Sequence, residues 1–283
     1  MRLAVVQMEP ILGEVERNLV SIHRLLNLAV RDGADFVVFP ECATTGYGFE
    51  SRSQALWKAE SIPGPSTEVV AKACRELGVT VVFGLLEREG EDLYNTAAIV
   101  GPDGSIDRYR KTHLPCVGAD RFTDPGEGPL RLWTVNGAMV GIGICFDGGF
   151  PEFVRTLAVL GADLVVLPTN WAEKAMRTAQ LIPPVRAFEN SIYFAACNRI
   201  GTEAGYRYIG RSSIFDPLGS ELALADHDRE EILFAEIDPA KARAKTVVHC
   251  PSEYEIDRVN WRRPDLYGPL VAPIPEFRGH GKR

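Results

Sequence analysis

One cysteine stands where a thiol could act as a nucleophile. Cys145 follows the apolar run 139–144, which contains two glycines and is typical of a strand buried on both faces. Pro151 comes shortly afterwards, and proline is favoured at the first position of a helix because its φ is already helical. We therefore expect Cys145 where a core strand ends and the chain turns into a helix.

The expected position has a consequence for the reactivity of the thiol. Unpaired backbone N–H groups at the start of a helix favour negative charge, so they lower a thiol pKa from about 8.5. A pKa near 7 requires roughly 2 kcal/mol of differential stabilisation, which a nearby lysine and a helix N-terminus could supply. The alternative is a buried cysteine that packs as a small hydrophobic residue.

Two further residues could complete the chemistry. A cysteine nucleophile needs a base, and its tetrahedral adduct needs positive charge or N–H donors. Glu41 follows the apolar strand 34–39 and Pro40, where burial would raise its pKa. Lys111 lies in a short basic stretch that leaves a strand. Each has an ordinary alternative, a surface or capping residue for Glu41 and a solvated one for Lys111.

An internal similarity indicates how these residues are positioned. The segment 33–40, Gly-Ala-Asp-Phe-Val-Val-Phe-Pro, is echoed by Gly-Ala-Asp-Leu-Val-Val-Leu-Pro at 161–168. Each copy follows a helical pattern and, before that, a buried strand, which predicts two related halves. Two sheets with helices on one face each would bury their bare faces together, giving an α/β fold in four layers, α-β-β-α. Glu41 and Cys145 would each follow a strand end, one in each half.

Composition limits the partners and the compartment. The net charge is −7 and the pI is near 5.4, which argues against nucleic acid or an anionic membrane as a partner. No apolar stretch reaches the length of a membrane span or a signal peptide. The six cysteines are scattered, without a CxxC pair or a histidine cluster, so we expect no metal site, no disulfide framework and a cytoplasmic location.

The domain organisation is expected to be simple. Residues 1–250 contain the periodic strands and helices, and we interpret them as a single domain. Residues 251–283 are rich in proline, arginine and aromatic residues without a clear period. They are too apolar for a disordered tail, so we expect an extended arm at a subunit interface.

Several motifs in order along the chain together carry a family resemblance. They include Pro40-Glu41, the stretch Tyr-Arg-Lys-Thr-His-Leu at 109–114, and Gly-Ile-Cys-Phe-Asp at 143–147 with Phe-Pro-Glu at 150–152. Further segments lie at 94–97, 168–171, 186–190, 210–219 and 263–268. In these segments the chain resembles the nitrilase superfamily of carbon–nitrogen hydrolases over almost its whole length.

The resemblance implies a cysteine-dependent hydrolase with an α-β-β-α sandwich and a Glu41-Lys111-Cys145 triad. Glu41 would take the Cys145 proton, and Lys111 with the backbone N–H of Phe146 would hold the oxyanion. A thioester would form and then be hydrolysed by water that Glu41 activates. No metal or organic cofactor is implied. The family also suggests a homodimer or a higher homo-oligomer.

Other candidate residues keep two interpretations. Many family members carry a further glutamate between the lysine and the cysteine, and Asp120 is the nearest carboxylate to that position. It could replace the glutamate with a shorter reach, or pair with Arg121 at the surface. Asn170 and Trp171 follow a strand end and could line the pocket or only pack, whereas Tyr47 could enclose a short acyl chain.

The reaction subtype is open at this level. A small amide is favoured, because Gly148 and Gly149 leave no anchoring arginine of the kind found in enzymes that cleave N-carbamyl amino acids. The nitrile-hydrolysing branch typically has Trp-Glu-Asn after the cysteine, where this chain has Phe-Asp-Gly. The alternatives are a nitrile or N-carbamyl hydrolase with the same triad, and a catalytically silent scaffold that binds a small molecule.

Overall fold

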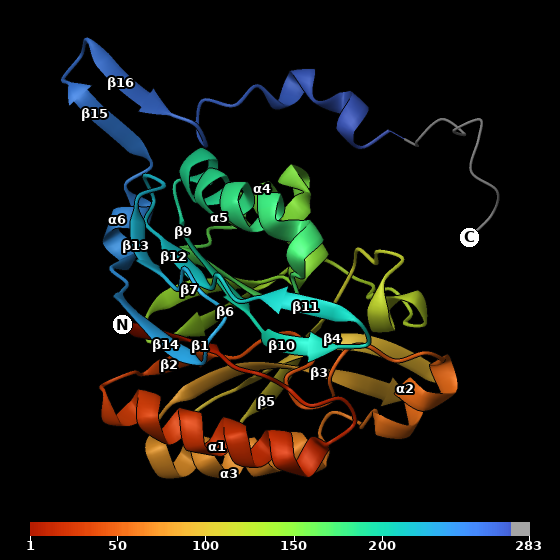
Figure 1. Cartoon of the computed structure of the whole chain (residues 1–283). Coiled ribbons are helices and arrows are strands. Elements are labelled where there is room, and N and C mark those ends of the chain that lie inside the picture. Colours follow the sequence, from red (N-terminus) through yellow and green to blue (C-terminus); the bar gives the residue numbers. More distant parts are fainter. Residues whose placement is uncertain (273–283) are drawn as a thin grey trace. The chain divides into compact units, whose positions relative to one another are not determined.

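Two six-stranded sheets form the centre of the larger of two structural units, Met1–Ala244, in the computed structural model, which describes residues 1–272 (Figure 1). The first sheet has the order β14 (Glu231–Glu236), β1 (Arg2–Gln7), β2 (Phe36–Val38), β3 (Thr80–Glu89), β4 (Asp92–Val100) and β5 (Ile106–Arg110). The second has the order β13 (Glu221–Leu224), β12 (Ser213–Phe215), β9 (Tyr193–Asn198), β8 (Leu164–Thr169), β7 (Ala138–Ile142) and β6 (Leu132–Val135).

The two sheets have the same plan. Strands β1, β2 and β3 run parallel, as do β7, β8 and β9. In each sheet one antiparallel strand lies outside the first of the three and two antiparallel strands lie outside the third. The predicted relation between the two halves therefore holds at the level of sheet topology.

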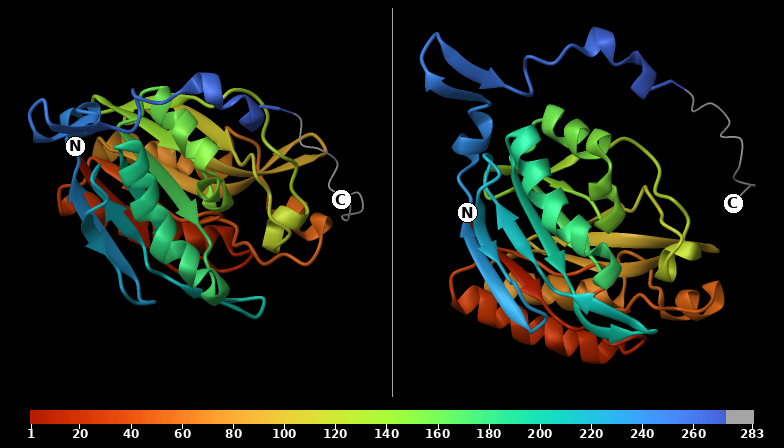
Figure 2. Two further views of the ribbon diagram at one scale, coloured as in Figure 1. Left: turned by 90° about the horizontal axis from the view of Figure 1, so that it is seen from above. Right: turned by 45° about the horizontal axis from the view of Figure 1, so that its top comes forward.

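Successive side chains of a strand point to opposite faces of its sheet, and this alternation explains the layers. In β1, Leu3 and Val5 belong to a core shared with strands of the second sheet, whereas Ala4 and Val6 pack with the helices of the first. Helices α1 (Val15–Arg31) and α3 (Pro65–Leu77) cover the outer face of the first sheet. Helices α4 (Pro151–Val159) and α5 (Met176–Asn190) cover the outer face of the second (Figure 2). The predicted α/β fold with two packed sheets is confirmed.

Helix α5 is not interrupted at its two internal prolines. The pair Pro183-Pro184 predicts a break or kink, but the helix does not break and runs through both residues to Asn190. Buried residues on either side of the pair hold it to the core, among them Ala179 and Ala187. Tertiary packing therefore outweighs the local cost of the prolines.

Several short elements connect the main strands and helices. They are α2 (Arg52–Lys58), η1 (Gly118–Arg121), η2 (Cys145–Gly149), η3 (Glu173–Ala175), α6 (Pro239–Arg243) and the hairpin β10 (Ile200–Glu203) with β11 (Tyr206–Ile209). The sequence did not predict α2 or this hairpin. Among residues 1–272, no helix is long and apolar enough to cross a membrane.

The smaller unit begins at Lys245. It contains the hairpin β15 (Thr246–Cys250) and β16 (Tyr254–Asp257), followed by the 3-10 turns η4 (Pro264–Leu266) and η5 (Gly268–Leu270). The expected boundary at residue 250 falls inside this hairpin. Residues 273–283 of the expected arm lie outside the described part of the chain.

Candidate active site

Glu41 is positioned by the end of β2. Phe39 donates its backbone N–H to Val82 on β3, and Gly84 donates to the carbonyl of Pro40. A Cβ on Gly84 would lie 2.6 Å from the Cα of Glu41, so only glycine lets the two backbones approach this closely. The Glu41 side chain is wholly buried.

Lys111 follows β5 directly and lies opposite Asn95 on β4, to whose carbonyl it donates its backbone N–H. Its Nζ lies 2.7 Å from Glu41 Oε1 and 2.5 Å from Asp120 Oδ2. Lys111 and Glu41 are wholly buried and Asp120 almost so. A single ammonium group therefore joins two carboxylates away from solvent.

Asp120 lies at this site and not in a surface pair with its neighbour. Besides Lys111, its Oδ2 accepts a hydrogen bond from the Tyr47 hydroxyl at 2.8 Å. Arg121 instead donates to the carbonyls of Gly118 and Phe49. Gly118 has φ +52°, and a Cβ there would lie 2.1 Å from the Tyr47 ring, so this tight turn brings Tyr47 and Asp120 together.

Asn95 is a site residue that sequence reasoning missed. Its Nδ2 donates to Glu41 Oε1 at 2.7 Å and to Asp120 Oδ1 at 2.8 Å, so one amide orients both carboxylates. The available signal was a polar pair, Asn95-Thr96, inside the otherwise apolar strand β4. The other oxygen of Glu41, Oε2, is buried without a hydrogen-bond partner in residues 1–272, which leaves it available to accept a proton.

Cys145 begins the 3-10 turn η2, close to the end of β7. Its φ is +46°, a left-handed conformation that is uncommon for a residue with a side chain and that concentrates at functional sites. Cys145 is partly exposed and lines a pocket. Helix α4 begins only at Pro151, so the turn η2 separates the thiol from the N-terminus of that helix.

The buried charges shift the pKa values of Lys111 and Glu41 and so determine which of the two can exchange protons. Burial alone lowers the pKa of Lys111, but the Asp120 and Glu41 carboxylates outweigh it and raise that pKa well above 10.5. Burial raises the pKa of Glu41 above 4.5, and the Lys111 ammonium opposes this rise while the Asp120 carboxylate adds to it. Lys111 is therefore a fixed positive charge, and Glu41 is the group able to exchange protons.

The expectation of a lowered thiol pKa is wrong. Burial, and then the Glu41 carboxylate, raise the pKa of Cys145 above its ordinary 9.0. Lys111 and the backbone N–H of Asn170 oppose this shift without reversing it. The main physical reason is that burial disfavours the charged thiolate, and the excess negative charge of the two carboxylates that share Lys111 adds to this effect.

The pocket that contains Cys145, called here the Cys145 pocket, has a volume of about 510 Å³. Tyr47, Phe146, Asn170 and Trp171, all expected near the site, line it. Asn170 is only 8% exposed, and among the described residues neither its Nδ2 nor its Oδ1 has a hydrogen-bond partner. The pocket therefore presents one unsatisfied amide group among mostly apolar and aromatic side chains.

The two glycines after the cysteine differ from the expectation that both form the pocket wall. Gly149 lines the pocket, and a Cβ on it would contact only the Phe146 ring, at 3.9 Å. A Cβ on Gly148 would lie 2.7 Å from Leu167, so that position faces the core. One glycine, and not two, leaves room at the pocket wall.

The hairpin β10–β11 supplies a wall that the sequence did not predict. Tyr206 and Tyr208 from β11 line the Cys145 pocket. Glu203 from β10 accepts backbone hydrogen bonds from Tyr47 at 2.8 Å and Gly48 at 2.6 Å, and its carboxylate pairs with Arg199 at 2.9 Å. This buried pair fixes the loop that carries Tyr47.

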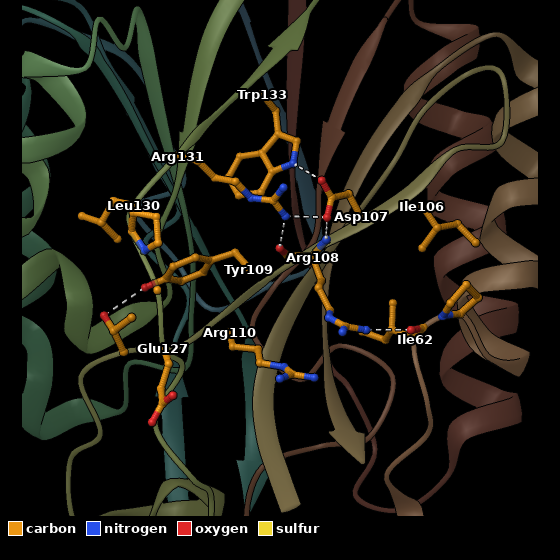
Figure 3. A pocket seen from close by; sticks show the side chains of 14 residues that line it. Ile62, Ile106, Asp107, Arg108, Tyr109, Arg110, Glu127, Leu130, Arg131 and Trp133 are labelled. Atoms are coloured by element: carbon orange, nitrogen blue, oxygen red, sulfur yellow. Dashed lines mark hydrogen bonds and ion pairs between the residues drawn. The ribbon is translucent and has the colours of Figure 1, made fainter. Parts of the chain in front are cut away.

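A second cavity of about 540 Å³, called here the edge pocket, lies over the edge strands β5 and β6. Figure 3 shows Arg131 and Trp133 directed at Asp107, and Arg108 directed at Ile62. The contacts of Arg131 and Trp133 with Asp107 join the two sheets at their open edges. Neither Glu41, Lys111 nor Cys145 lines this cavity.

Residues 2–246 match the carbon-nitrogen hydrolase family, and the chain belongs to that family. It is thus a hydrolase that acts on carbon–nitrogen bonds, as the sequence predicted.

Named relatives cover most of the chain. A nitrilase of Pyrococcus abyssi is 39% identical over 251 residues, which cover 87% of this chain and 93% of the relative. An omega-amidase of Danio rerio is 33% identical over 252 residues, which cover 84% and 88%. The solved structure of an amidase from Nesterenkonia sp. AN1 has a TM-score of 0.80 at 25% identity and covers 96% of this chain and 100% of its own. That structure is a mutant with acrylamide added at its active-site cysteine.

Proposed function

We propose that this protein hydrolyses small amides through a thioester on Cys145, with Glu41 and Lys111 as the other catalytic residues. The observation that carries the proposal is the contact of buried Lys111 Nζ with Glu41 and Asp120 beside the pocket that Cys145 lines. The relatives support an amide substrate, since they include an omega-amidase and an amidase with an active-site cysteine.

The pKa directions assign a role to each group. Because the thiol pKa is raised, Cys145 is protonated at rest, and Glu41 Oε2 accepts its proton as sulfur attacks the carbonyl carbon. The C–S bond forms, and the carbonyl oxygen takes the negative charge beside Lys111 and the backbone N–H of Phe146. Lys111 keeps its proton throughout because its own pKa is so high.

The second half of the reaction uses the same carboxyl group. Protonated Glu41 donates its proton to the nitrogen, the C–N bond breaks, and ammonia or an amine leaves. Glu41 then takes a proton from water, which attacks the thioester carbon. The C–S bond breaks, the thiol recovers its proton from Glu41, and the carboxylic acid leaves.

The pocket favours an acyl group that is short and carries a polar end. Asn170 offers a donor and an acceptor that a substrate could satisfy, since burial without a partner is costly. Lys174 lines the same pocket, is exposed, and has no ion-pair partner within residues 1–272. We propose that it attracts an anionic or carbonyl group at the far end of the acyl chain.

The test is a substrate panel with released ammonia as the readout, run on the full chain and on Cys145→Ala. Short amides, with and without a terminal carboxylate, are compared with nitriles and N-carbamyl amino acids. We expect kcat/KM for a small amide to exceed that for the other classes by at least about tenfold, or roughly 1.4 kcal/mol. A better nitrile or N-carbamyl substrate would reject the amide assignment and leave the triad intact.

Mass spectrometry separates an enzyme from a silent scaffold. An amide substrate quenched in acid during turnover should leave an acyl group on the Cys145 peptide. A protein that only binds small molecules would show no acyl mass on any amide in the panel. A nitrilase among the relatives keeps nitrile hydrolysis as the second candidate, and its thioester would give the same adduct.

We also propose that the protein forms a homodimer, or a larger homo-oligomer, in the cytoplasm. Leu181 and Val185 leave an apolar stripe on the outer face of α5, and Val159 and Leu160 extend it at the end of α4; all four side chains are exposed. In the smaller unit, considered by itself, Trp261 is exposed. Six free cysteines suit a reducing compartment.

Light scattering tests the assembly. We expect a particle of at least twice the chain mass of 31.2 kDa at micromolar concentration. Val185→Asp should dissociate it, whereas Val20→Asp, at an exposed apolar position on α1, should not. A wild-type monomer would contradict the proposal.

A further inference from the structure

Asp147 carries an unusual concentration of hydrogen bonds for one carboxylate. It lies in η2, two residues after Cys145, and is wholly buried. Its Oδ2 accepts from the Tyr109 hydroxyl at 2.8 Å and from the backbone N–H of Ile144 at 2.9 Å. Its Oδ1 contacts the Thr112 hydroxyl at 3.0 Å, and the backbone N–H and Nδ1 of His113 at 3.0 and 2.7 Å.

These partners come from two segments that belong to different sheets. Tyr109, Thr112 and His113 flank Lys111 on both sides, at the end of β5 in the first sheet. Ile144 and Asp147 flank Cys145 after β7 in the second sheet. Asp147 thus joins the chain around Lys111 to the chain around Cys145.

Ring contacts strengthen the same link. The His113 ring stacks on Phe150 with centroids 3.9 Å apart and meets Phe153 edge-on at 5.8 Å. Both phenylalanines lie where η2 passes into α4. In Figure 3 the Tyr109 ring is directed away from Arg108 and Arg131 of the edge pocket, and its hydroxyl contacts Thr112.

The turn η2, which begins with Cys145, needs contacts of this kind to hold it in place. The left-handed φ of Cys145 costs free energy, so contacts outside the turn must hold it. Arg186 on α5 secures the far end of the turn by donating to the carbonyls of Gly148 at 2.9 Å and Gly149 at 3.0 Å. Asp147 holds the end of the turn that is close to Cys145, and it also contacts the segment that carries Lys111.

We propose that Asp147 is a positioning residue that sets the place of the Cys145 thiol relative to Lys111 and Glu41. The proposal rests on the function proposed above. Asp147 acts through the two main-chain segments that its carboxylate joins and does not enter the Cys145 pocket. A carboxylate suits the role because its partners are hydrogen-bond donors, and an amide in its place would turn an N–H toward some of them.

The experiment compares Asp147→Asn with a matched control, Asp163→Asn. Asp163 is also buried and hydrogen-bonded, to the Met139 backbone N–H at 2.8 Å and to Arg243 at 2.7 Å, but it precedes β8 at the end opposite the site. Two readouts are taken: kcat and KM for the best amide, and the rate at which chloroacetamide alkylates Cys145. Peptide mass spectrometry follows the alkylation, with exposed Cys116 and Cys250 as internal references.

We expect Asp147→Asn to lower kcat by about 10²-fold with KM changed less than about threefold, because a displacement of about 1 Å has that effect. Alkylation of Cys145 should slow by at least about tenfold, while Cys116 and Cys250 react as before. Asp163→Asn should change both rates less than about twofold, whatever its effect on thermal stability.

Conservative variants keep the test decisive if Asp147→Asn does not fold. Tyr109→Phe and Thr112→Val each remove one donor to Asp147, and each should lower kcat and the alkylation rate by roughly three- to tenfold. Unchanged rates in folded variants would overturn the proposal, and so would a raised KM at constant kcat. Alkylation needs no amide turnover, so this arm stands even if the proposed reaction proves wrong.

Discussion

The Cys145 pocket and the edge pocket have similar volumes, about 510 and about 540 Å³, but they differ in whether their polar side chains are paired with one another. In the edge pocket the charged side chains neutralise one another. Arg131 pairs with Asp107 at 2.5 Å, and Arg110 pairs with Glu87 at 2.5 Å. Asn170 lines the Cys145 pocket, and its side-chain amide has no hydrogen-bond partner among the described residues; the same holds for Glu41 Oε2 beside the pocket.

Because the two volumes are nearly equal, cavity size alone does not indicate which pocket is the candidate active site. Paired charges over β5 and β6 protect two open sheet edges from association and connect the sheets. Unsatisfied polar groups around a thiol are poised for a ligand. Changes at the buried site beside the Cys145 pocket should therefore affect activity and stability more than changes in the edge pocket.

The largest effect is expected from the nucleophile. Cys145→Ala should leave less than about 1% of wild-type hydrolysis, with the melting temperature nearly unchanged. Glu41→Gln should lose orders of magnitude as well, and the double variant should be little worse than either single one, because the residues act as a unit. Steady-state kinetics with ammonia as the readout measures this, and activity above about 1% would identify another nucleophile.

The next comparison concerns stability. Lys111→Met leaves the buried carboxylates of Glu41 and Asp120 facing each other, which should cost about 3–5 kcal/mol of unfolding free energy. Arg131→Met breaks an exposed pair in the edge pocket and should cost about 1 kcal/mol or less. Urea unfolding of both variants gives the two values. Equal losses would mean that the buried ion cluster contributes no more than the exposed pair.

The pH profile follows from the shifted groups. In the proposed mechanism Glu41 must be ionised, and its raised pKa should place the acid limb of kcat/KM above pH 4.5. Lys111, with its pKa well above 10.5, should give no alkaline limb below about pH 10. Asp120 raises the pKa of Glu41, so Asp120→Asn should move the acid limb to lower pH while kcat falls by about 10²-fold. An acid limb that moves upward would contradict this sign.

Asn170 should have a smaller effect, on binding. Asn170→Ala removes the unsatisfied amide from the Cys145 pocket, and kcat/KM should fall by roughly 5- to 150-fold, equivalent to about 1–3 kcal/mol. The loss should appear mainly in KM if the amide contacts the substrate equally in the ground and transition states. Trp171→Phe, at its neighbour in the pocket, serves as a control for shape. A KM that does not change would place Asn170 outside the binding contacts.

The sequence predicts Glu41 and Cys145 as site residues. It does not predict several residues that hold the site together, and the reasons are physical. Glu41 and Cys145 each follow an apolar strand, one in each half of the chain, so the expected packing of two related sheets places both at strand ends on the same side of the molecule. Asn95, Asp147 and Glu203 take their site partners from distant parts of the chain, and local spacing does not reveal these contacts. Their roles arise from burial among specific donors and acceptors, which only the packed structure provides.

The thiol pKa illustrates the same limit. The local pattern around Cys145 predicts a lowered value, because it contains a strand end before a helix. The actual shift depends first on the burial of the thiol and then on the carboxylates that share Lys111. The second of these carboxylates, Asp120, could be assigned to the site from the sequence only as one of two alternatives. Charge balance in a buried cluster is a property of all its members and not of one motif.

The smallest effect is expected from the edge pocket itself, and it tests the comparison most directly. Arg131 is 53% exposed at its side chain and contacts Asp107 and the carbonyl of Arg108, with no contact to Lys111's partners. Arg131→Ala should therefore leave kcat/KM within about twofold of wild type, although Arg131 lines a cavity about as large as the Cys145 pocket. The measurement uses the same amide and pH as the Cys145→Ala assay, with light scattering to detect association through the unprotected edges. A loss of kcat/KM beyond about tenfold in a monodisperse sample would mean that β5 transmits changes at this edge to Lys111. The paired charges of the edge pocket would then affect catalysis as well as connect the two sheets.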